Sequence, residues 1–166
     1  EDIVVNLQGD EPMMPAVLVD QVAGLLESHP QDAIGTLASK VATLNAFLDP
    51  NVVKVITDAQ GRALYFSRAP IPWGRDSAPA GLASQRGFAG ARRHVGLYAY
   101  RVEALRRLSM SPPSLLEQIE KLEQLRALEA GLSIRVAEAQ VAPGPDVNTP
   151  EDLVRVERLI LAGGES

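Results

Sequence analysis

The stretch VVNLQGDEP, residues 4–12, decides the fold class of this chain. Its apolar, β-branched start predicts a strand covered on both faces, which is typical of a central parallel strand. The run then ends in Gln8, Gly9, Asp10 and Glu11. Ligands of open α/β sheets bind beyond the carboxyl ends of the strands. These four residues therefore form either a polar turn or the edge of a binding site.

Strand-like and helix-like segments alternate along the rest of the chain. Periodicity and turn residues predict strands at 33–41, 94–101 and 134–141, a hairpin at 52–68, and helices at 15–28, at 114–131 and from about 149 onward. This order predicts a layered α/β domain over residues 1–166, with a mostly parallel sheet and an inserted hairpin. Residues 69–92, rich in Pro, Gly, Ala and Ser, are expected to form a long functional or disordered loop.

Two helix starts carry clear signals. Ser114 and Glu117 have the spacing of a capping box, and Leu115, Ile119, Leu122 and Leu125 follow as an apolar stripe. Glu117 and Glu120 are expected on the solvated side of that helix. In the last helix Thr149 is expected to cap and Pro150 to occupy the first helical position.

Composition excludes several classes of function. The 166 residues carry a formal charge of −5, which argues against a nucleic-acid surface. Cysteine is absent, so thiolate catalysis, disulfides and Cys-ligated zinc are excluded. No apolar stretch approaches the length of a membrane span, and no signal peptide opens the sequence. A cytoplasmic protein is expected.

Individual residues at the strand ends suggest a chemistry. Asp10 offers the hard oxygens that Mg²⁺ prefers beside phosphate. Arg68 follows a predicted strand, where its guanidinium has the geometry to hold a carboxylate. His94 and Tyr98 are four residues apart on a predicted strand and should share one face.

Five ordered segments resemble the 3-deoxy-manno-octulosonate (Kdo) cytidylyltransferases, the CMP-Kdo synthetases. They are VVNLQGDEPMMP (4–15), NVVKVITDAQGRALYFSRAPIPWGRD (51–76), RHVGLYAYR (93–101), SLLEQIEKLEQLRALEAG (114–131) and VNTPEDLVRVE (147–157). The resemblance covers most of the chain. It implies the three-layer, Rossmann-like fold of the nucleotide-diphospho-sugar transferases. It also implies a reaction in which CTP and Kdo give CMP-Kdo and pyrophosphate for lipopolysaccharide synthesis.

The resemblance also implies roles for particular residues. Asp10 would bind Mg²⁺ and act in catalysis together with Arg75, which would face either sugar or phosphate. Glu11 is left open between a site residue and a solvated acid. Trp73 is expected to anchor the long loop rather than line the sugar site. Substrate binding would fall to Gln8, Arg68, His94, Tyr98, Glu123 and Gln124, with His94 as a hydrogen-bonding group rather than a general base.

One position departs from the family pattern. The second metal ligand of the family is usually an Asp, and Asn148 stands at the matching place. An amide oxygen still coordinates hard cations. Either Asn148 or Asp146, two residues earlier, is expected to complete the Mg²⁺ site, and capping of the last helix is the alternative role of Asn148.

Other readings stay open at this point. The family's N-terminal triphosphate-binding segment, with its RLPGKP loop, is not in this sequence, so a C-terminal two-thirds with little turnover of its own is expected. The full-length protein is expected to be a homodimer. The alternatives are a cytidylyltransferase for 8-amino-Kdo or a sialic acid, and a non-catalytic module that binds sugar acids.

Overall fold

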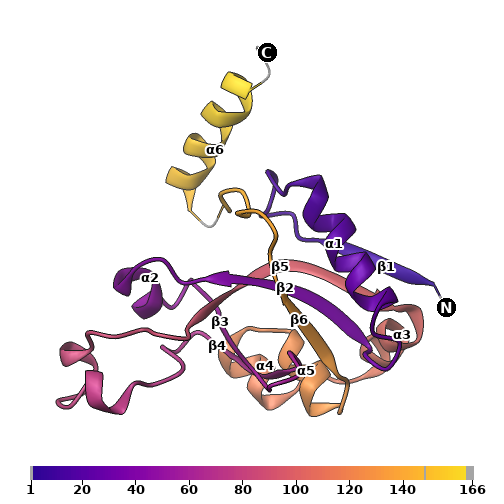
Figure 1. The fold of residues 1–166 in the computed structure, drawn as a ribbon. Helices are drawn as coiled ribbons and strands as arrows, with labels where there is room; N and C mark the ends of the chain where they lie inside the picture. Colours follow the sequence, from indigo (N-terminus) through magenta and orange to yellow (C-terminus); the bar gives the residue numbers. More distant parts are fainter. Residues whose placement is uncertain (1, 148, 164–166) are drawn as a thin grey trace.

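The computed structural model describes residues 2–147 and 149–163. Their helices are arranged around one β-sheet (Figure 1). Within these residues the sheet has six strands: β1 (Ile3–Leu7), β2 (Ile34–Lys40), β3 (Lys54–Thr57), β4 (Ala63–Ser67), β5 (Arg92–Arg101) and β6 (Ile134–Glu138). The helices that accompany it are α1 (Ala16–Glu27), α2 (Leu44–Leu48), α3 (Val102–Met110), α4 (Leu115–Glu120), α5 (Gln124–Glu129) and α6 (Pro150–Gly163).

The long strand β5 lies at the centre and reverses the expected strand directions. It pairs antiparallel with β1, β2 and β3, and β3 pairs antiparallel with β4. Among the described strands only β2 and β6 are parallel neighbours. The prediction of a mostly parallel sheet is therefore wrong. The hairpin β3–β4 and the loop after it bring the chain back so that β5 runs against its neighbours, a connection that the order of elements does not reveal.

Helices cover both faces of the sheet, which confirms the α/β class and the three layers (Figure 1). On one face Leu18, Val22 and Leu26 of α1 are fully buried against β2 and β5. On the other face Tyr98 and Tyr100 pack with residues from α3, α5 and β6. The predicted helical periodicity of α1 is confirmed by these buried positions.

Strand β1 exists where the sequence predicts it, but not as a fully covered central strand. Val4 and Leu7 are 41% and 47% exposed, and β5 is the strand that pairs with it among the described residues. Its apolar run therefore does not correspond to two buried faces in this structure.

The predicted hairpin and long loop are confirmed. Gly61 takes a φ of 81° in the turn between β3 and β4, a conformation that favours glycine. The segment before β5 contains two short 3-10 turns, Arg75–Ser77 and Leu82–Ser84. Trp73 in this segment is 44% exposed.

The single helix predicted for 114–131 is two helices. The capping box of Ser114 and Glu117 is present at the start of α4. Lys121 then adopts a left-handed conformation with φ 55°, and α5 begins at Gln124. Leu122 and Leu125 are buried as expected, whereas Leu115 and Ile119 are 68% and 67% exposed.

The last helix, α6, starts as predicted. Pro150 is its first residue, and the Thr149 hydroxyl accepts a hydrogen bond from the N–H of Asp152 at 3.2 Å. In Figure 1 this helix extends away from the sheet. Each helix within residues 2–147 and 149–163 is too short or too polar to cross a bilayer.

Candidate active site

A polar cavity of about 340 Å³ lies beyond the end of β1, between β5 and the α4–α5 junction. Its walls come from segments that are far apart in the sequence. The lining residues, which define what is called the polar cavity below, are Gln8, Asp10, Glu11, Asn51, Val53, Arg68, Arg93, His94, Gly96, Tyr98, Lys121, Leu122, Glu123, Gln124 and Asp146. Seven of the nine residues assigned to the site from sequence are in this list.

The end of β1 is tied directly to the α4–α5 junction. Gln8 Nε2 donates a hydrogen bond to Glu123 Oε1 at 2.9 Å. Gly96 of β5 makes room for this contact, because a Cβ there would lie 2.9 Å from Gln8 Oε1. Two residues predicted to bind substrate thus contact each other across the cavity.

The left-handed turn at Lys121 explains why Glu123 and Gln124 reach the cavity. A continuous helix would keep the stripe of Leu122 and Leu125 inside and leave the intervening residues at the helix edge. The break puts exposed Glu123 and buried Gln124 at the start of α5, facing the cavity.

His94 and Tyr98 share one face of β5, as predicted, with ring centroids 5.1 Å apart. The Thr36 hydroxyl donates to the carbonyl oxygen of Leu97 at 2.8 Å, so it accepts from His94 Nε2 at 3.0 Å. This leaves Nδ1 of a neutral imidazole as an acceptor. Burial lowers the pKa of His94 to about 3, helped by the nearby Arg93, so this imidazole is a weak base.

A cluster of charged residues beside Asp10 was not identified as such from the sequence. Glu11 is 7% exposed, and burial, together with the charge of Asp146, raises its pKa to about 7. Arg93 Nη2 lies 2.9 Å from Asp146 Oδ2. Arg93 and Asp146 meet from β5 and from the segment after β6, a contact between distant segments that local sequence patterns do not signal.

One assigned residue does not line the cavity, and another lies outside the described residues. Arg75 is exposed in a 3-10 turn of the long loop and is not one of the lining residues. Asn148 lies outside the described residues. The preceding residue, Val147, donates its N–H to the Asp10 carbonyl oxygen at 2.8 Å, so the segment that leads to position 148 runs beside Asp10.

The oxygen ligands in the cavity suit a metal ion that is shared with substrate phosphates better than one that is held by protein side chains alone. Within the described part of the chain, no three His, Asp or Glu side chains are grouped to hold a metal. Mg²⁺ is usually bound by one or two carboxylates together with substrate phosphates. The exposed carboxylate of Asp10 on the cavity wall is suited to such a site.

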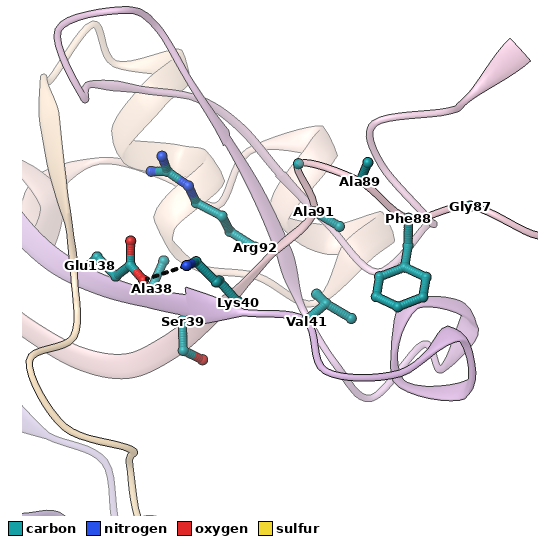
Figure 2. Close-up of a pocket in the computed structure, with 11 residues that line it drawn as sticks. Ala38, Ser39, Lys40, Val41, Gly87, Phe88, Ala89, Ala91, Arg92 and Glu138 are labelled. Atoms are coloured by element: carbon teal, nitrogen blue, oxygen red, sulfur yellow. Dashed lines mark ion pairs between the residues drawn. The ribbon is translucent and has the colours of Figure 1, made fainter.

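A second pocket is larger than the polar cavity, and its lining is mostly apolar. Figure 2 shows this apolar pocket, about 580 Å³, at the end of β2 beside Phe88, Ala89 and Ala91. The ion pair on its wall, between Lys40 Nζ and Glu138 Oε1 at 3.8 Å, is strongly exposed. Because its lining gathers few convergent polar groups, size alone does not make it the candidate active site.

Comparisons with known proteins agree with the resemblance seen in the sequence. A family model described as cytidylyltransferase matches residues 1–134. The chain is 49% identical over 162 residues to a 3-deoxy-manno-octulosonate cytidylyltransferase of Thioalkalivibrio sulfidiphilus, covering 98% of this chain and 64% of that protein. It is 52% identical over 167 residues to the protein of the same description from Alkalilimnicola ehrlichii, covering 99% of this chain and 63% of that protein.

Solved structures extend the similarity to three dimensions. A CMP:2-keto-3-deoxy-manno-octonic acid synthetase complexed with CTP superposes with a TM-score of 0.81 at 39% identity, over 98% of this chain and 63% of that one. A 4-diphosphocytidyl-2C-methyl-D-erythritol synthase from Anaerococcus prevotii, with a TM-score of 0.52 at 11% identity, shares the fold. The chain spans less than two thirds of the length of the relatives it matches.

Proposed function

The chain belongs to the cytidylyltransferase family, and we propose that its protein transfers CMP from CTP to Kdo, giving CMP-Kdo and pyrophosphate. The observation that carries this proposal is the polar cavity. Residues assigned from five separate sequence segments, or their close neighbours, converge on it. Relatives at about half identity that are described as Kdo cytidylyltransferases support the same choice of sugar.

The proposed reaction is a displacement at the α-phosphorus of CTP. The anomeric hydroxyl oxygen of the sugar forms the new bond to the α-phosphorus and its proton is released to solvent. The bond from the α-phosphorus to the oxygen that bridges to the β-phosphate breaks, and pyrophosphate leaves with that oxygen. Such transfers depend mainly on in-line positioning and on charge stabilisation. Asp10, with residue 148 or Asp146, would hold Mg²⁺, which neutralises charge on the phosphate oxygens when bound.

The chemistry of the cavity suits an acidic, polyhydroxylated sugar. Arg68 supplies the cation for the carboxylate, and Gln8, Glu123 and Gln124 supply donors and acceptors for hydroxyl groups. Neutral His94 is suited to accept a hydrogen bond from a hydroxyl group rather than to remove a proton.

The test uses the protein expressed from its complete reading frame. Incubated with CTP, Mg²⁺ and Kdo, it should release pyrophosphate and form CMP-Kdo, with a higher kcat/KM for Kdo than for 8-amino-Kdo or a sialic acid. Binding of Kdo without turnover would favour the non-catalytic module. A preference for a sialic acid would reassign the substrate within the same family.

The metal proposal has its own test. Mn²⁺ binding in the presence of CTP is measured by electron paramagnetic resonance. The affinity should be at least tenfold weaker in Asp10→Asn, because this variant loses one charge-assisted contact. Unchanged binding would contradict the assignment of Asp10.

A homodimer in the cytoplasm, serving lipopolysaccharide synthesis, remains part of the proposal. Exposed Trp73 and Leu82 on the long loop, 44% and 57% accessible, are suited to a contact between subunits. Light scattering of the full-length protein tests the dimer directly, and a monomeric mass would contradict it.

A further inference from the structure

Arg68, the proposed cation for the sugar acid, is held in place by backbone oxygens. Its Nε donates to the carbonyl oxygen of Glu120 at 2.7 Å, and its Nη1 donates to the carbonyl oxygen of Pro50 at 2.9 Å. Among the described residues, no acceptor is paired with Nη2. The guanidinium is therefore fixed on two of its nitrogens, and Nη2 remains for a ligand.

The carboxylate of Glu120 fixes the backbone of Arg68. Its Oε2 accepts the N–H of Arg68 at 2.8 Å, and its Oε1 accepts the Ser67 hydroxyl at 2.7 Å. Glu120 itself is not one of the residues that line the polar cavity. Ser67 ends β4 and Arg68 follows it, so Glu120, the last residue of α4, joins this helix to the end of that strand.

Lys54 holds Arg68 from the opposite side. Its side chain is fully buried, and Nζ donates to the carbonyl oxygen of Arg68 at 2.7 Å and to that of Asp49 at 2.9 Å. The N–H and the C=O of Arg68 are thus bound by side chains of opposite charge. A residue held at four points loses little further freedom when it binds a ligand.

We infer that Glu120 is a positioning residue for Arg68, setting its guanidinium for the carboxylate of the sugar acid. The inference rests on the proposed function. Glu120 ends α4, and the left-handed turn at Lys121 follows it. The contact between Glu120 and Arg68 therefore also fixes the distance from Arg68 to Glu123 and Gln124, which line the cavity. Glu120 acts through Arg68 and does not touch the substrate.

The experiment is a double-mutant cycle in the protein expressed from its complete reading frame. Glu120→Gln replaces one acceptor oxygen by a donor group and should raise the KM for Kdo about tenfold, as expected for a misplaced charge-assisted contact. The KM for CTP should stay within about twofold. In an Arg68→Ala background the same change should have no further effect on kcat/KM for Kdo, because the residue it positions is gone.

Glu117→Gln is the matched control. Glu117 lies in the same helix and completes the capping box, and its Oε2 lies 3.3 Å from Arg126 Nε. The residue of this helix that binds Arg68 is Glu120. It should lower stability without changing the KM for Kdo. If Glu120→Gln does not fold, Glu120→Asp, which keeps the charge and shortens the reach, should show the same pattern with a smaller change.

Two results would overturn the inference. One is an unchanged KM for Kdo in folded Glu120→Gln or, where that variant does not fold, in Glu120→Asp. The other is an equal loss with and without Arg68, which would mean a general effect on folding. Failure of the unmodified protein to form CMP-Kdo would instead refute the proposed function, on which the inference rests.

Discussion

At the scale of single residues, the polar cavity depends on close contacts that small side chains permit. Gly96 lies where β5 passes Gln8 and Glu11, and a Cβ there would stand 2.9 Å from Gln8 Oε1 and 3.3 Å from Glu11 Oε1. The atoms in the way are the ends of side chains. A larger residue at this position should therefore disturb the site more than the fold.

Gly96→Ala tests this contact. We expect the Gln8–Glu123 hydrogen bond to be displaced and kcat/KM for Kdo to fall about tenfold, the value of one hydrogen bond between polar groups. The melting temperature should change little. Steady-state kinetics and calorimetry of the purified variant measure both.

Gly24→Ala in α1 is the control, because an added Cβ there meets nothing within 4 Å. It should leave kinetics unchanged and stabilise the helix by about 0.5–1 kcal/mol. Unchanged kcat/KM in Gly96→Ala would contradict the role given to the Gln8–Glu123 contact.

His94 predicts a pH dependence of stability. Its pKa falls from 6.5 to about 3 through burial. Between these values the unfolded chain binds a proton that the folded chain does not, so the free energy of unfolding decreases as the pH falls. The slope should approach about 1.4 kcal/mol per pH unit. Urea unfolding of wild type and of His94→Gln across about pH 4.5 to 7.5 isolates the contribution of this group, as the difference between the two free energies of unfolding. No change in the slope with pH would contradict a neutral imidazole in the folded protein.

Local sequence patterns identify functional residues that lie at the end of a predicted strand or within a family motif. Asp10, Arg68, His94 and Tyr98 belong to this class, and the structure brings them to one cavity. Glu120 does not, because its partners, Ser67 and Arg68, are more than fifty positions away. A helix pattern alone predicts that it is solvated, and only the placement of the last residue of α4 beside the end of β4 reveals its contacts.

At the scale of secondary-structure elements, the junction between α4 and α5 decides where the cavity ends. The sequence predicts one helix there because the apolar stripe continues through Leu122 and Leu125. Lys121 interrupts it with a φ of 55°. No glycine or proline marks this break, so propensity could not predict it.

Lys121→Val should destabilise the protein, because a β-branched residue is strongly disfavoured in the left-handed region. We expect a loss of about 1–2 kcal/mol in the free energy of unfolding, measured with urea. Lys121→Gly should cost nothing or stabilise slightly, since glycine adopts this conformation readily. Equal stability of the Val and Gly variants would show that the left-handed turn is absent.

At the scale of the whole molecule, a buried ion pair and the polar cavity lie at opposite ends of three strands that run in the same direction. β1, β2 and β6 run in one direction, because β5 opposes β1 and β2 while β6 is parallel to β2. Before β2 and at the start of β6, Asp32 and Arg135 form a buried ion pair at 2.6 Å. Beyond the other ends lie Gln8, Asp10 and Asp146 of the polar cavity.

Asp32→Ala should therefore destabilise the fold without altering substrate binding. It leaves the guanidinium of Arg135 buried with no carboxylate partner, which costs about 3–5 kcal/mol. Urea unfolding measures the loss, and the KM for Kdo should not change.

Glu138→Ala is the comparison for this pair. It removes the exposed partner of Lys40, whose side chain is 84% accessible, and should cost less than about 1 kcal/mol. If Asp32→Ala costs no more than Glu138→Ala, the buried pair does not stabilise this end of the sheet.

The central claim is that the polar cavity, and not the larger apolar pocket of Figure 2, receives the sugar acid. A crystal structure of the protein with Kdo bound tests it most directly. We predict the sugar carboxylate within hydrogen-bond distance of the Arg68 guanidinium, with hydroxyl groups beside Glu123 and Gln124. Sugar density beside Phe88 and Ala91, with only solvent in the polar cavity, would contradict the account.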